Sequence, residues 1–135
     1  MNIAIRTDRN ISKTDILELY VANKWSSAEK PDILYKALLG SHSLITAWKG
    51  DQLVGLANAI SDGHLVVYYP HMLVHPTYHG NGVGKRLFDV LQETYSGFHM
   101  QMLTADGKAI QFYEKMGFTR AGKTEPMWIY QGDEH

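Results

Sequence analysis

Residues 73–87 read LVHPTYHGNGVGKRL and decide how the rest of the sequence is interpreted. The apolar run that ends at Val74 is typical of a strand, and a proline turn follows it. Three alternating glycines, Gly80, Gly82 and Gly84, then lead into an amphipathic helical stretch. Glycine allows positive φ and close approach of a ligand to the backbone, and the first amides of a helix are unpaired donors. The stretch therefore predicts an anion site, most simply for a phosphate-bearing ligand held by main-chain groups.

The composition limits the class of protein. The chain has 135 residues, is 44% hydrophobic and carries a formal net charge of −1, so we expect a single domain over residues 1–135 and no nucleic-acid partner. The absence of cysteine excludes a disulfide framework, a thiolate metal site and a cysteine nucleophile. The N-terminus does not resemble a signal peptide and no segment reaches membrane-spanning length, so we expect a cytoplasmic protein with no membrane contact.

Hydrophobic periodicity predicts the element order β-αα-βββ-α-β-α-ββ. Strands are expected at residues 3–6, 44–48, 53–60, 65–74 and 98–103, with a closing hairpin formed by residues 118–121 and 127–130. Helices are expected at residues 13–22, 31–39, 82–95 and 107–116, the first capped by Ser12 and the last by Asp106. Three strands joined by hairpins precede the glycine loop, which argues against a doubly wound parallel sheet.

Two common phosphate motifs do not fit the loop. A P-loop requires G-x-x-x-x-G-K-[ST], but Gly84-Lys85 is preceded five residues earlier by His79 and followed by Arg86. A dinucleotide-binding fingerprint, G-x-G-x-x-G, would place its third glycine at Lys85. The ligand is therefore not assigned by either motif.

The stretch instead resembles the acetyl-coenzyme A motif of the GNAT N-acetyltransferases, [Q/R]-x-x-G-x-[G/A] after a V-x-P-like turn. Val74-His75-Pro76 supplies the turn, and His79 stands where the family usually has Gln or Arg, with Gly82 and Gly84 following. A second family motif, AIQFYEKMGF, occupies residues 109–118. With both motifs in the family's element order over essentially the whole chain, the sequence is identified as a member of this family, similar to its small bacterial and plastid-type members.

The resemblance implies an α+β fold, an α/β/α sandwich whose mixed, mostly antiparallel sheet is flanked by helices. The sheet would be splayed between the fourth and fifth strands, here residues 65–74 and 98–103. Acetyl-CoA would bind in this splay as the acetyl-donor cosubstrate, its pantetheine arm paired with the main chain of Leu73 and Val74. The pyrophosphate would rest, without a metal, on the loop formed by His79, Gly80, Asn81, Gly82, Val83, Gly84 and Lys85.

The resemblance also implies direct attack by a primary amine of a small molecule on acetyl-CoA, with a tetrahedral intermediate stabilised by the Val74 amide. Tyr113 matches the tyrosine that many members use as general acid, although an apolar helix face also suits a purely structural ring. His71 is the candidate base, and a water chain is the alternative. Trp25 and Ser26 lie in the loop that borders the acceptor pocket in this fold.

Two other functions stay open. A protein or peptide lysine acetyltransferase would need an open acceptor groove, and a non-catalytic CoA-binding regulatory module would account for the lack of an obvious base. Dimerisation through the closing strands is common in the family, and the apolar residues 127–130 would allow a homodimer. The spacing of the histidines matches no ligand template, so no metal is expected.

Overall fold

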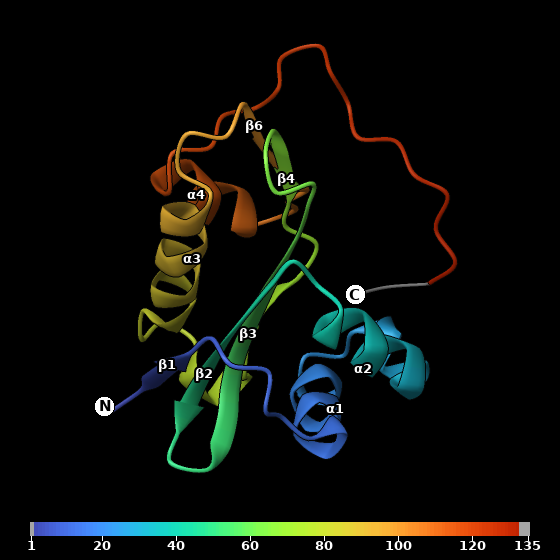
Figure 1. The fold of residues 1–135 in the computed structure, drawn as a ribbon, viewed down its shortest axis with the longest axis vertical. Coiled ribbons are helices and arrows are strands. Elements are labelled where there is room, and N and C mark those ends of the chain that lie inside the picture. The colour runs from blue at the N-terminus through green and yellow to red at the C-terminus, as the bar shows by residue number, and fades with distance from the viewer. Residues whose placement is uncertain (1, 133–135) are drawn as a thin grey trace.

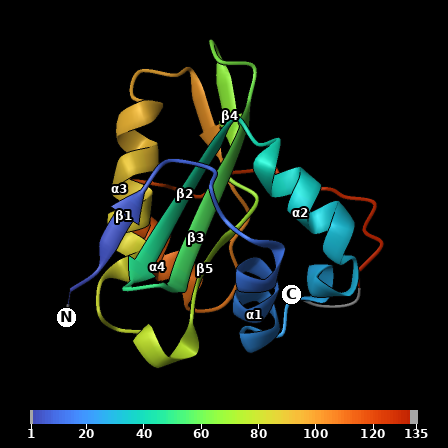
Figure 2. The ribbon, with the colours of Figure 1, turned by 60° about the horizontal axis from the view of Figure 1, so that its bottom comes forward.

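The computed structural model describes residues 2–132, in which a six-stranded sheet lies between two pairs of helices (Figure 1). The strands are β1 Ala4–Arg6, β2 Ser43–Lys49, β3 Gln52–Ser61, β4 Val66–Tyr68, β5 Met72–Val74 and β6 Met100–Met102. The helices are α1 Lys13–Ala22, α2 Pro31–Leu39, α3 Val83–Thr94 and α4 Ala109–Lys115, with short 3-10 turns η1 Ser26–Glu29 and η2 Pro76–Tyr78. Helices α1 and α2 cover one face of the sheet, and α3 and α4 cover the other (Figure 2). The expected α/β/α sandwich is confirmed.

Strands β2 and β3 form the centre of the sheet and are buried on both faces, because their side chains alternate between two cores. The core beside α3 includes Ile45, Ala47, Val54 and Ala57. The core beside α1 and α2 includes Leu44, Trp48, Leu53 and Leu56. At Gly55 a Cβ would lie 3.0 Å from atoms of both Val83 and Leu87, so glycine allows α3 to lie close against β3.

The starts of α1 and α2 lie where the sequence predicts them, and the start of α4 does not. Ser12 Oγ accepts a hydrogen bond from the Asp15 amide at 3.1 Å, which confirms the predicted cap of α1. Pro31 occupies the first turn of α2, as expected. The prediction that Asp106 caps the last helix is wrong, because α4 starts later, after Lys108, and has no side-chain cap.

The strand expected at residues 65–74 is divided into β4 and β5 by a bulge. The register passes from Ile60↔Tyr68 to Ala57↔Met72, so two residues of β3 lie opposite three of the other strand, including Pro70. Proline has no N–H for the ladder, which is why the interruption falls here. Strand β4 therefore differs in register from β5 by one residue.

The two parallel strands of the sheet separate at this bulge. Strand β4 pairs with β6 from Val66↔Met100 to Tyr68↔Met102, and the Tyr69 amide still donates to the Met102 carbonyl at 3.0 Å. Strand β5 pairs with β3 and with no other strand of the described chain. The expected splay is therefore confirmed, with β4 and β5 together as the fourth strand of the prediction and β6 as the fifth.

The closing hairpin predicted at residues 118–121 and 127–130 is wrong. Residues 118–132 contain no strand and run away from the sheet before returning towards α1 and α2 (Figure 1). Met127 and Ile129 are 94% and 93% exposed. Four consecutive large apolar residues, MWIY, do not define one buried face, so the sequence cannot fix a register for this segment. No helix within residues 2–132 is long and apolar enough to cross a membrane.

Candidate active site

The glycine loop has the backbone that its sequence requires. Gly80 and Gly82 have φ of 81° and 77°, in the left-handed region where other residues are strained. Gly82 precedes α3, and no side chain caps the first amides of that helix. A Cβ on Gly84 would lie 3.4 Å from atoms of Met72, so this glycine lets α3 approach β5 closely. The start of α3 thus offers main-chain donors and a favourable dipole to an anion.

Two side chains of the glycine loop donate hydrogen bonds to main-chain carbonyls of the loop and of β5. His79 Nε2 lies 2.8 Å from the Val74 carbonyl, and since a carbonyl only accepts, the ring N–H is the donor. Asn81 Nδ2 donates to the carbonyls of Tyr78 and His79. Lys85 forms an exposed ion pair with Asp89 at 2.8 Å. These contacts connect the loop to the end of β5.

One hydrogen-bonding edge of strand β5 pairs with β3, and the other edge faces the splay between β5 and β6. The Asn58 amide donates to the His71 carbonyl, and the His75 amide donates to the Val54 carbonyl. Because the hydrogen-bonding side alternates along a strand, Leu73 also faces β3, opposite Leu56, whereas Met72 and Val74 face away from it. Of the two residues expected to bind pantetheine, Val74 thus turns its main chain into the splay and Leu73 does not. Sequence reasoning missed Met72, since the bulge sets this alternation.

Tyr113 lies on α4 in a cluster of aromatic rings, with centroids 5.4 Å from Phe88 and 5.0 Å from Phe112. Burial raises the pKa of Tyr113 to about 12, so its phenol is protonated at neutral pH. The residue also lines a cavity of about 480 Å³ bounded by β6, α4 and residues 118–126. Its surroundings therefore suit both a structural ring and a proton donor.

His71 lies directly before β5, on the opposite face of the sheet from Tyr113. His71 Nδ1 is 2.7 Å from the hydroxyl of Tyr20, a fully buried residue of α1. The Trp25 ring meets the imidazole edge-on at 5.0 Å. The structure thus brings Trp25 and Tyr20 to His71, and sequence reasoning missed the Tyr20 contact.

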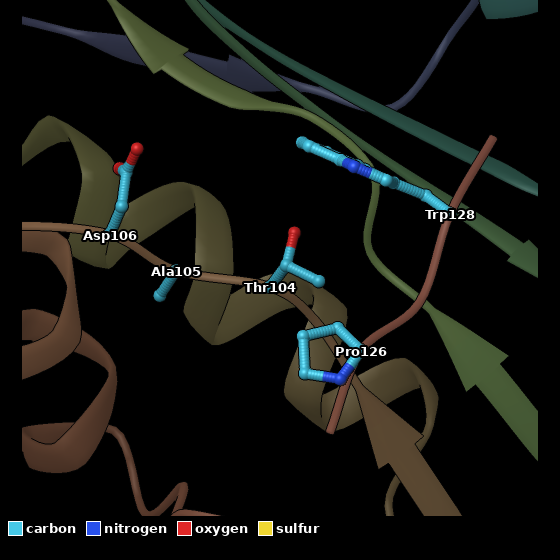
Figure 3. A pocket seen from close by; sticks show the side chains of 5 residues that line it. All are labelled: Thr104, Ala105, Asp106, Pro126 and Trp128. Atoms are coloured by element: carbon cyan, nitrogen blue, oxygen red, sulfur yellow. The ribbon is translucent and has the colours of Figure 1, made fainter. Parts of the chain in front are cut away.

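A pocket of about 330 Å³ lies between the loop after β6 and the C-terminal segment. Its lining residues are Thr104, Ala105, Asp106, Pro126 and Trp128 (Figure 3). The Thr104 hydroxyl and the Asp106 carboxylate point to the side on which the Trp128 ring lies (Figure 3). Trp128 stacks on Tyr130 at 4.6 Å, and the Tyr130 hydroxyl lies 3.3 Å from Ser26 Oγ. This pocket thereby connects the end of β6 with the predicted acceptor loop.

Metal ligands do not gather anywhere in the part of the chain that the structure describes. Within residues 2–132, no group of three or more His, Cys, Asp or Glu side chains is arranged to hold a metal ion. The site is therefore described by its main-chain donors, its aromatic rings and its polar side chains.

Residues 8–126 match the family model described as Acetyltransferase (GNAT) domain. A GNAT family acetyltransferase from Streptococcus pneumoniae is 28% identical, with a TM-score of 0.83, over 96% of this chain and 99% of that one. Glucosamine-6-phosphate N-acetyltransferase from Arabidopsis thaliana is 16% identical, with a TM-score of 0.72, over 97% and 99% of the two chains. The aminoglycoside N-acetyltransferase AAC(6')-Iy, bound to a CoA–acetylneamine bisubstrate analogue, is 16% identical, with a TM-score of 0.71, over 98% and 99%. The last two share the fold. The chain belongs to the GNAT family and is an acetyltransferase.

Proposed function

We propose that this acetyltransferase passes the acetyl group of acetyl-CoA to the primary amine of a small molecule by direct attack. The observation that carries the proposal is the splay between β5 and β6 beside the left-handed glycine loop. The main-chain groups of Met72 and the amide of Val74, which face away from β3, would pair with an extended amide-bearing arm, as an added strand does. The loop amides would hold a diphosphate. CoA carries both of these parts in one molecule.

Some residues of the glycine loop would contact CoA directly, and others would hold the loop in shape. Gly80, Gly82, Val83 and Gly84 would supply amides to the pyrophosphate, while Lys85 adds a nearby positive charge. His79 and Asn81 support the loop, because Asn81 donates hydrogen bonds to the loop's own carbonyls and His79 donates one to the Val74 carbonyl. The Leu73 main chain is engaged with β3 and contributes through its place in the strand.

The chemistry requires a proton donor, an oxyanion partner and a neutral amine. Tyr113 would protonate the thiolate as the C–S bond breaks and the N–C bond forms, since its raised pKa keeps the phenol protonated. The Val74 amide would donate to the developing oxyanion. For removal of the amine proton, His71 and water are the two candidates that the sequence leaves open.

A small acceptor is supported by the pocket at the end of β6. Its volume, about 330 Å³, suits a small molecule, and Asp106 and Trp128 offer a carboxylate and an aromatic face to a cationic amine. Ser26, which follows Trp25 in the chain, borders the same region through its contact with Tyr130. Two structural neighbours are named for small amine acceptors, glucosamine-6-phosphate and aminoglycosides.

The test is a thiol-release assay with acetyl-CoA over panels of small amines, amino acids and lysine peptides, beside a calorimetric measurement of CoA binding. We expect CoA release with a small amine, in equal amount to the acetylated product found by mass spectrometry. Release with peptides alone would make the protein a lysine acetyltransferase. Binding of CoA without release for any acceptor would make it a regulatory module.

We also propose a homodimer in which residues 127–130 of one copy pair with β6 of the other. Strand β6 lies at the end of the sheet order, and the apolar residues 127–130 are extended chain that forms no strand within the described residues. Light scattering should give twice the monomer mass. Ile129→Lys should give a monomer, whereas a wild-type monomer at all concentrations would contradict this arrangement.

A further inference from the structure

Asn81 and Gly82 form the only Asn-Gly step in the sequence, and this step lies in the glycine loop. Both residues are exposed, and Gly82 has a φ of 77°. The Asn81 side chain thus lies at the surface beside a main-chain amide that no Cβ shields. The other asparagines are each followed by a residue with a side chain, and they are Asn2, Asn10, Asn23 and Asn58.

The amide nitrogen of Gly82 is a nucleophile without an engaged proton. Within residues 2–132 it donates no hydrogen bond, since it lies directly before α3, where no side-chain cap is present. Asparagine is among the chemically labile residues of proteins. Its side-chain carbonyl carbon is attacked by the main-chain nitrogen that follows it, and a glycine at that position hinders the attack least.

The Asn81 side chain is held in the loop only by weak contacts. Nδ2 donates to the Tyr78 carbonyl at 3.2 Å and to the His79 carbonyl at 3.3 Å. Both bonds are long and exposed, so water replaces them at little cost. The hairpin glycine Gly63 differs, because its amide is engaged by Ser61 Oγ at 2.9 Å. The glycine loop therefore combines a loosely held asparagine with an unengaged glycine amide.

We propose that Asn81 is a site of self-modification in the unliganded protein, and that CoA prevents the reaction by engaging the Gly82 amide. The Gly82 nitrogen attacks Asn81 Cγ, so that a new N–C bond closes a succinimide ring and the Cγ–Nδ2 bond breaks. The amide proton leaves with Nδ2 as ammonia. Water then opens the ring at one of its two carbonyls and leaves aspartate or isoaspartate, with no oxidant or reductant involved.

The modified loop is unsuited to a pyrophosphate. Isoaspartate adds one carbon to the main chain before Gly82 and displaces its amide, and both products place a carboxylate beside the proposed anion site. Loss of one hydrogen bond to a charged group corresponds to about 10- to 100-fold in CoA affinity. This consequence, and the protection by CoA, rest on the proposed function of the loop, whereas the reaction of Asn81 does not.

The first measurement follows the asparagine-containing peptides by mass spectrometry and needs no acceptor. The folded protein, with and without saturating CoA, is incubated at mildly alkaline pH beside the urea-unfolded chain. We expect Asn81 to exchange its amide nitrogen for oxygen, with an equal amount of ammonia released, and CoA to stop the exchange. Asn23 is the matched control, because its side chain donates to the Leu19 carbonyl and lysine follows it, so it should stay intact.

Two outcomes of this measurement would overturn the proposal. One is an Asn81 that stays intact in the folded protein while the urea-unfolded chain reacts. The other is an exchange rate that CoA does not change, although calorimetry shows that CoA binds.

The second measurement is calorimetry of CoA binding. The modified protein, separated by ion exchange through its added negative charge, should bind CoA about 10- to 100-fold more weakly than the fresh protein. Fresh Asn81→Asp should also bind more weakly than the fresh wild type. Asn81→Gln, whose longer side chain closes a ring less readily, should keep on incubation the affinity of its own fresh sample. Modified protein that binds as tightly as fresh protein would overturn the inactivation. A fresh wild type that binds no CoA would overturn the proposed function, and the mass measurement would still decide whether Asn81 reacts.

Discussion

The loop between β5 and α3 holds its shape through its own main chain, whereas the proposed acceptor region, which includes Ser26 and Trp128, is assembled from distant segments. In the loop, left-handed glycines and the carbonyl contacts of His79 and Asn81 fix the peptide directions. In the acceptor region, Tyr130 reaches Ser26 across more than a hundred residues of sequence, through one hydrogen bond of 3.3 Å. The proposed cofactor half is therefore determined by local sequence, and the proposed acceptor half depends on contacts between distant segments.

The largest effect is expected at Tyr113, the proposed general acid. Tyr113→Phe keeps the ring contacts with Phe88 and Phe112 but removes the proton donor, so kcat should fall by about 10²- to 10⁴-fold. Steady-state kinetics with saturating acetyl-CoA measures this. Tyr35→Phe is the matched control, because its hydroxyl donates to the Ile11 carbonyl away from the splay. Full turnover in Tyr113→Phe would leave Tyr113 with a structural role.

The pH dependence of the same step is a second measurement. The pKa of Tyr113, raised to about 12, means that the donor form is present at all lower pH values and is lost only as the pH rises through about 12. The kcat profile of the wild type should therefore show no alkaline decline caused by Tyr113 up to about pH 10, the ordinary value for a phenol. A decline near neutral pH that Tyr113→Phe abolishes would contradict this assignment.

Gly82 tests whether the cofactor half depends on its backbone. Alanine at φ 77° is strained by about 1–2 kcal/mol, and an exposed loop relaxes by leaving this conformation, which CoA binding must then restore. Gly82→Ala should weaken CoA binding by about tenfold, measured by calorimetry. Gly97→Ala is the matched control: its φ is 84°, an added Cβ meets nothing within 4 Å, and it lies beyond the far end of α3. Equal affinities in the two variants would contradict a backbone-held pyrophosphate.

Trp128 tests the acceptor half. The side chain is part of the pocket and 67% exposed, so Trp128→Ala should raise the KM for the amine by about threefold to tenfold, the value of one cation–π contact at a partly exposed site. CoA affinity and the unfolding midpoint should not change. Met127→Ala is the neighbouring control, since Met127 is 94% exposed and does not line the pocket. A change in CoA affinity in place of KM would assign the pocket to the cofactor.

The smallest effect is expected from substitutions of His79, the residue that connects the loop to β5. Removing its N–H contact to the Val74 carbonyl in His79→Ala should weaken CoA binding by about threefold to tenfold, as expected for a single hydrogen bond. His79→Gln, which restores the residue usual in the family and keeps a donor, should bind within about twofold of the wild type. A loss in His79→Gln equal to that in His79→Ala would point to a direct role of the imidazole at the pyrophosphate.

The sequence predicts those parts of the fold whose causes are local. Ser12 and Pro31 mark helix starts, and Gly80 and Gly82 require a left-handed turn wherever the chain lies. The bulge at Pro70 could not be predicted, because β4 and β5 together form one continuous apolar pattern whose pairing partner is distant. The Tyr20–His71 contact joins residues 51 positions apart, and neither has a spacing that signals the other. Residues 127–130 are rich in residue types that favour strands, but a strand forms only where such residues find a partner edge.

The bulge at Pro70 also changes which side chains face which core. Before it, the odd-numbered Val67 and Tyr69 face α3, and after it the even-numbered Met72 and Val74 do so. Odd-numbered Leu73 consequently enters the core beside α1, and His71 reaches Tyr20. If the chain kept Pro70 but paired without a bulge, an uninterrupted period of two would turn His71 and Leu73 towards α3, and Met72 and Val74 towards α1. The one extra residue at the bulge thus determines that the histidine stands on the face of the sheet that α1 and α2 cover.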